Sequence, residues 1–170
     1  MIRDAMEIGV LVERRMLQNP WIDHAWVPNG VLVGVPTAAP WTVLGETAEA
    51  TWFYAGPFRL EFFSTDTGSY RGNLDSGRPS LWISLRTADT PPGVILHTVT
   101  ADPAEGEALT EPGTNIVEAV AMQQAVRTRL AAFVEAHHVE RSFIKRKRDR
   151  ADPQAMSRRA GGSRFPEGGQ

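Results

Sequence analysis

The chain has 170 residues, 42% of them hydrophobic and 22% charged, a composition typical of one soluble globular domain that can bury its own core. Because it has no cysteine, and its four histidines lack metal-ligand spacing, we expect no disulfide, thiol nucleophile or metal site. Residues 1–140 carry 9 Arg against 17 Asp and Glu, whereas residues 141–170 carry 9 Lys and Arg against 3 acids, which predicts an acidic body with a basic arm.

The first predicted strand and turn lie near the start of the sequence. Residues 8–12 form an apolar run with β-branched residues at both ends, and Asn19-Pro20 biases the chain away from helix. A second strand is expected to follow around Trp21 and Trp26, whose two indoles can supply much of the core. These indoles bracket Asp23-His24, a clustered titratable pair.

Apolar runs predict the remaining strands. Residues 51–55 and 58–63 are expected to form a hairpin around Gly56-Pro57, because apolar and charged residues alternate in its second arm. Residues 42–44 are expected to pair beside the apolar run 31–35. Further strands are predicted at residues 81–86, 94–100 and 116–120.

Two helices are predicted in the second half of the chain. Asp102 is a typical N-cap, with Pro103 at the first helical position and Glu105 at the third, and residues 111–113 end this helix. Residues 123–138 have the apolar stripe of an amphipathic helix, which we expect to pack on the sheet. The stripe consists of Val126, Leu130, Phe133 and Val134.

Asp23 and His24 are the most enzyme-like pair, because a carboxylate can orient an imidazole and raise its basicity. Adjacent residues of a strand point to opposite faces, so we predict that these side chains do not meet and favour a structural role in the turn. A polar loop at residues 64–79, with one helical turn near residues 70–74, supplies further polar groups. The alternative is a pocket formed by Trp21, Asp23, His24, Trp26, Tyr70, Arg71 and Asn73.

The basic arm follows the last predicted helix. Its apolar pair, Phe143 and Ile144, precedes a run of basic residues formed by Lys145, Arg146, Lys147, Arg148 and Arg150. Such a run can bind nucleic acid, an anionic membrane or an acidic protein face. Because it lacks interleaved aromatic residues and the body is acidic, we favour a protein partner or a solubilising role. We expect residues 1–142 to form a single β-rich domain and residues 143–170 a largely disordered tail.

Two stretches carry a resemblance to a known family. They read GVLVERRMLQNPWIDHAWVPNGVLVGVPTAAPWTVL and HHVERSFIKRKRDR. With them the chain resembles, over most of residues 5–150, a family of uncharacterised proteobacterial proteins known only as a conserved domain of unknown function. Genes of that family tend to lie beside those for molybdenum-dependent formate dehydrogenase, its dedicated chaperone and related accessory proteins. The resemblance implies a role in maturation or assembly, and it implies no catalytic residue.

We therefore predict an α+β domain, mainly β, in which seven or eight mostly antiparallel strands form a curved sheet or partly closed barrel with a packed C-terminal helix. For function we favour a non-enzymatic accessory protein that binds formate dehydrogenase subunits or their chaperones, without a cofactor. The alternatives are a small-molecule-binding or hydrolytic barrel and nucleic-acid binding through the basic arm. The sequence has no apolar run of about 20 residues and no secretory signal pattern, so a cytoplasmic location is expected.

Overall fold

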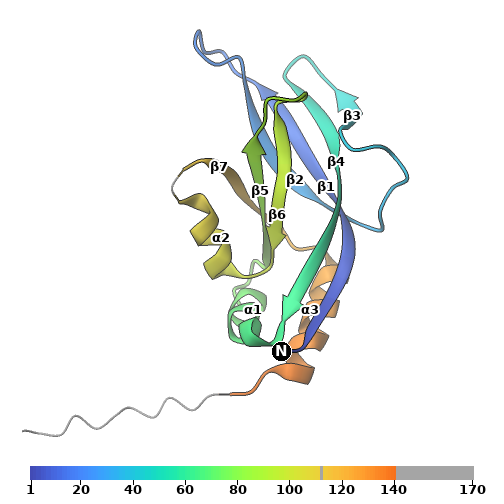
Figure 1. Cartoon of the computed structure of the whole chain (residues 1–170), viewed down its shortest axis with the longest axis vertical. Coiled ribbons are helices and arrows are strands. Elements are labelled where there is room, and N and C mark those ends of the chain that lie inside the picture. The colour runs from blue at the N-terminus through green and yellow to red at the C-terminus, as the bar shows by residue number, and fades with distance from the viewer. Residues whose placement is uncertain (112, 141–170) are drawn as a thin grey trace, which may run out of the picture. The chain divides into compact units, whose positions relative to one another are not determined.

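The computed structural model describes residues 1–111 and 113–140, and Met1–Val139 form one compact unit. Over the described residues the chain forms seven strands, three α-helices and one 3₁₀ turn (Figure 1). In chain order these are β1 (Arg3–Met16), β2 (His24–Val33), β3 (Thr42–Glu46), β4 (Ala50–Phe63), η1 (Ser64–Asp66), α1 (Thr67–Leu74), β5 (Ser80–Thr87), β6 (Val94–Thr100), α2 (Pro103–Thr110), β7 (Asn115–Ala121) and α3 (Gln124–His137).

The strands form two antiparallel sheets that are not closed into a barrel. The first sheet has the order β2-β1-β4-β3 and the second has the order β6-β5-β7. The centre of the first sheet is the pair β1 and β4, each 14 residues long. The predicted class, α+β and mainly β, is therefore confirmed. Of the two predicted alternatives, the structure has curved antiparallel sheets and not a partly closed barrel.

The predicted hairpin at Gly56-Pro57 is wrong, because residues 50–63 form one continuous strand. The register against β1 shifts here, with Val10 opposite Gly56 and Leu11 opposite Tyr54, so Ala55 is the extra residue of a β-bulge. Gly56 has φ +129°, a conformation that glycine adopts without strain. The same Gly-Pro pair that suggested a turn therefore bends a long strand.

The connection between β2 and β3 also differs from the prediction. β3 pairs with β4 and not with the apolar run 31–35, of which residues 31–33 belong to β2. The connecting loop crosses the face of the sheet over glycines of β1 and β4. A Cβ added at Gly9 would lie 3.3 Å from Pro36 Cδ, and one at Gly56 would lie 3.3 Å from Pro40 Cβ. The two missing side chains make room for the loop, which reaches the far edge of the sheet.

The two sheets and α3 share one hydrophobic core. Val10 of β1 and Ile83 of β5 are both fully buried in it. The predicted stripe of α3 is confirmed, since its four apolar residues are all buried and the Phe133 ring lies 6.1 Å from that of Phe62. Burying that stripe contributes roughly 6 to 12 kcal/mol before entropy is subtracted. Packing is therefore what holds this helix in place.

Helix α2 begins as predicted and packs on the second sheet through a glycine. Asp102 Oδ1 accepts a hydrogen bond from the Ala104 backbone N–H at 2.9 Å, and Pro103 is the first helical residue. Gly106 lies directly on the indole of Trp82 in β5, where an added Cβ would be 2.3 Å from Trp82 Cγ. The helix approaches the sheet this closely only because Gly106 has no side chain.

Candidate functional site

The structure places the predicted pocket residues in two separate groups. His24 pairs with Met16 at one end of β1, whereas Phe63, whose backbone N–H donates to the Tyr70 hydroxyl, pairs with Arg3 at the other end. A strand of 14 residues spans roughly 40 Å at about 3.3 Å per residue. The group at residues 21–26 and the group at residues 70–73 therefore do not line one pocket.

Tyr70 and Asn73 lie in α1, a full helix of eight residues where a loop with one helical turn was predicted. Tyr70 is only 2% exposed, and burial raises the pKa of its hydroxyl to about 12. The Asn73 amide donates to the carbonyls of Ser80 and Ala101, each at 2.8 Å, and accepts from the Ser80 N–H at 3.0 Å. Both side chains are buried and engaged in hydrogen bonds within the fold.

Arg71 lies on the exposed side of the same helix. Its Nε is 3.9 Å from Asp75 Oδ2, one turn further along, and 51% of its side chain is exposed. An ion pair this open to solvent contributes little to stability. Arg71 therefore differs from its two buried neighbours and sits on the surface of α1.

Asp23 and His24 do meet, which corrects the prediction that they point apart. Asp23 Oδ1 lies 2.6 Å from His24 Nδ1. The strand argument fails because β2 begins at His24 and Asp23 precedes it in the turn. The pair is open to solvent, with 83% of the Asp23 side chain and 37% of the His24 side chain exposed. Such a pair can orient an imidazole, but an exposed position gives it none of the low dielectric of an enclosed site.

The two tryptophans of this segment have opposite roles, although both were expected to supply the core. Trp26 is buried against the rings of Trp41 and Phe53, with centroids 5.7 Å and 5.5 Å away. The Arg14 guanidinium lies 5.8 Å from the Trp26 centroid, within cation–π range. Trp21 is 89% exposed. Trp26 therefore fixes the base of the turn, and Trp21 is presented to solvent.

The last residue of β1 and the turn that follows it carry four exposed apolar side chains, and we call residues 16–22 the apolar turn. The four side chains are Met16, Leu17, Trp21 and Ile22, exposed by 49%, 37%, 89% and 57%. Figure 1 shows this turn, in blue, projecting past the end of the first sheet. Only Trp21 was singled out from the sequence. No local signal separates the others from buried apolar residues, because the longer uncharged stretch at residues 25–45 contains core residues such as Trp26 and Val31.

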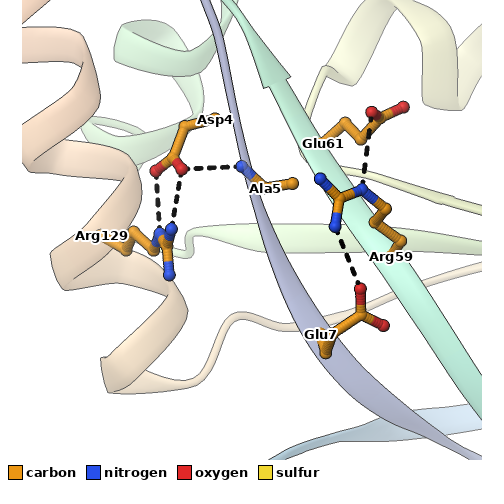
Figure 2. A network of polar contacts seen from close by, with 6 residues as sticks. All are labelled: Asp4, Ala5, Glu7, Arg59, Glu61 and Arg129. Atoms are coloured by element: carbon orange, nitrogen blue, oxygen red, sulfur yellow. Dashed lines mark hydrogen bonds and ion pairs between the residues drawn. The ribbon is translucent and has the colours of Figure 1, made fainter.

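A second polar cluster ties the opposite end of β1 to α3 and β4 (Figure 2). Asp4 accepts two hydrogen bonds from Arg129, at 2.7 Å and 2.8 Å, and these hold the pKa of the Asp4 carboxyl below its ordinary value. Arg59 lies between Glu7, at 3.3 Å, and Glu61, at 3.9 Å. Each charged side chain in this cluster lies beside one of opposite charge, so the cluster links β1 to α3 and to β4.

The part of the chain that the structure describes contains neither a metal-holding cluster of side chains nor a membrane-spanning helix. Among residues 1–111 and 113–140, no group of three or more His, Asp or Glu side chains is placed to hold a metal ion. None of the described helices is both long and apolar enough to cross a membrane. The predicted basic arm, residues 143–150, lies outside the described residues.

Comparison with known proteins gives a family match. A family model described as "Protein of unknown function (DUF3305)" matches residues 7–148. No curated protein and no solved structure matches the chain.

Proposed function

We propose that this chain, which belongs to the DUF3305 family, is a non-enzymatic accessory protein that binds a protein partner during maturation or assembly of a molybdenum-dependent formate dehydrogenase. The partner is a dehydrogenase subunit or its chaperone, and the location is the cytoplasm. The choice of enzyme system rests on the resemblance of residues 9–44 and 137–150 to the family whose genes lie beside that system.

The observation that carries the binding role is the apolar turn. A tryptophan that is 89% exposed, beside an isoleucine that is 57% exposed, leaves apolar surface in water without any benefit to the isolated fold. The polar residues expected to line a pocket do not offer such a surface, because Tyr70 and Asn73 already form hydrogen bonds within the fold. Surface for association is therefore present, whereas the residues expected to line a pocket are dispersed.

The test is purification of the tagged full-length chain from its native host, followed by identification of what co-purifies. We expect dehydrogenase subunits or their chaperone, and we expect a strain lacking the gene to lose formate dehydrogenase activity. A deletion strain with full activity, together with no co-purifying dehydrogenase component, would rule the proposal out.

The hydrolytic alternative is tested in the same strain by complementation with His24→Ala. Since His24 is half-exposed and its partner Asp23 is open to solvent, this change should leave the fold intact. We expect it to restore dehydrogenase activity as fully as the wild-type gene. Failure of a folded His24→Ala protein to complement would favour chemistry at Asp23 and His24 instead.

The basic arm is tested by truncation after Ser142. We expect the β domain to stay folded. Partner binding should weaken mainly at low salt, because salt screens the attraction between charges, which reaches only about 8 Å at physiological salt. Tight binding of the full chain to generic DNA with a steep salt dependence, and none to protein, would shift the function to nucleic acid.

A further inference from the structure

The apolar turn is held in shape before any partner arrives. The Leu17 backbone N–H donates to the Asp23 carbonyl at 2.9 Å, and the Met16 N–H donates to the Glu49 carbonyl at 2.8 Å. The Asn19 side chain accepts from the Trp21 N–H at 2.9 Å, which fixes the bend around Pro20. A turn fixed in this way loses little conformational entropy on binding.

The charges that flank the apolar turn are satisfied within the chain. Glu13 and Arg15 are joined by hydrogen bonds of 3.1 Å and 3.3 Å on the β1 side. Asp23 and His24 are joined at 2.6 Å on the β2 side. Between these pairs the turn carries no charge. The centre of a complementary surface must therefore be apolar.

We infer that the apolar turn is a docking element that inserts Trp21 and Ile22 into an apolar pocket on the surface of a protein partner. Exposed aromatic side chains at the centre of a contact supply most of the binding energy in many interfaces. The inference deepens the proposed function and rests on it only for the partner's identity, a dehydrogenase subunit or its chaperone. Binding through this element should be insensitive to salt, in contrast to binding through the basic arm.

Two other occupants fit the turn less well. Residues 1–140, which include the turn, carry 9 Arg against 17 acids, a net charge of −8 that disfavours contact of the turn with an anionic membrane. The basic arm, which can attract such a membrane, lies at residues 143–150 and is not part of the turn. In a symmetric dimer through the turn two convex surfaces would meet, which would leave much of their exposed apolar surface in water. A convex turn of this size instead suits a concave pocket.

The test measures binding of full-length variants to the purified formate dehydrogenase complex and, separately, to its chaperone. The variants are Trp21→Ala and Ile22→Ala, with Leu44→Ala as the matched control because Leu44 of β3 is 54% exposed outside the turn. We expect Trp21→Ala to weaken binding about 30-fold or more, and Ile22→Ala about tenfold, at both about 0.05 M and about 0.5 M sodium chloride. Leu44→Ala should bind as the wild type does, and all three variants should keep the wild-type thermal midpoint.

Several outcomes would overturn the inference. If the wild-type chain binds the dehydrogenase or its chaperone and Trp21→Ala binds equally well, the proposed function stands and the docking element is wrong. Trp21-dependent flotation with phosphatidylcholine vesicles, or a dimer in sedimentation equilibrium that Trp21→Ala abolishes, would assign the turn to a membrane or to a second copy.

If the wild-type chain binds neither probe, the proposed function fails and the docking element is tested separately. A photoreactive residue placed at position 22 in the native host should then give an adduct to one protein, and position 44 should give none. The inference survives if that protein, once purified, binds the chain with the same dependence on Trp21. No protein adduct at position 22 would overturn it.

Discussion

Replacing Gly106 of α2 with alanine should destabilise the domain, although alanine is the better helix former. Intrinsic propensity favours alanine over glycine by up to about 1 kcal/mol within a helix. The new methyl group would, however, lie 2.3 Å, 2.5 Å and 2.6 Å from Cγ, Cδ2 and Cδ1 of Trp82. Carbon atoms prefer separations of roughly 3.5 to 4.0 Å, so α2 must move outward by more than about 1 Å.

That movement strains the contacts that hold α2. The Thr100 hydroxyl donates to Glu105 at 2.6 Å, and the Asn115 amide donates to the Leu109 carbonyl at 2.9 Å. Overpacking costs about 1 to 3 kcal/mol and a weakened hydrogen bond costs about 1 kcal/mol. After the gain in propensity is subtracted, we expect a loss of about 2 kcal/mol in the free energy of unfolding. For a domain of this size that lowers the thermal midpoint by roughly 7 °C.

The assay is thermal and urea unfolding of the full-length chain, followed by circular dichroism. Gly72→Ala in α1 is the matched control, because a Cβ there meets none of the described atoms within 4 Å. It should raise stability by up to about 1 kcal/mol. In a Trp82→Ala background, Gly106→Ala should lose its cost because the obstructing ring is gone. A Gly106→Ala protein as stable as the wild type would refute the packing argument.

Three further predictions concern the polar groups that hold the fold. Asn73→Ala leaves three backbone groups without their partner, so urea denaturation should show a loss of about 3 to 5 kcal/mol; a loss below about 1 kcal/mol would contradict the structure. The hydrogen bonds from Arg129 lower the pKa of Asp4 in the folded protein. The stability that this pair provides is therefore fully present above the ordinary carboxyl pKa, and it is lost as the pH falls through the lowered pKa of the folded state. Arg129→Gln should therefore cost less than about 1 kcal/mol at neutral pH and nothing in acid, because both side chains are partly exposed. Burial raises the pKa of Tyr70 to about 12, so the stability linked to its neutral hydroxyl is complete below its ordinary value of 10.0 and lost as pH rises towards 12. Tyr70→Phe should therefore lose less stability than the wild type between neutral pH and this alkaline window, and equal alkaline sensitivity of both proteins would count against this assignment.

Several features follow from local sequence because short-range chemistry decides them. The start of α2 is readable from Asp102 and Pro103, since an N-cap and a first-turn proline act within one helical turn. The buried stripe of α3 is readable from its period, because the face of a helix depends only on spacing. The strands at residues 80–87, 94–100 and 115–121 follow from their apolar runs.

Other features depend on a partner strand, which local sequence does not specify. Gly56-Pro57 is suited equally to a hairpin turn and to a bulge. It forms a bulge because β1 is long enough to pair with the residues on both sides of it. The contact between Asp23 and His24 depends on where β2 begins. The prediction placed both residues in the strand, whereas β2 begins at His24 and leaves Asp23 in the turn.

Burial of a large side chain is likewise a tertiary property. The sequence by itself determined that two tryptophans lie close together in the chain. Only the packing of Trp26 against Trp41 and Phe53 placed one indole in the core and left Trp21 in solvent, because burial depends on contacts with distant strands and not on residue type.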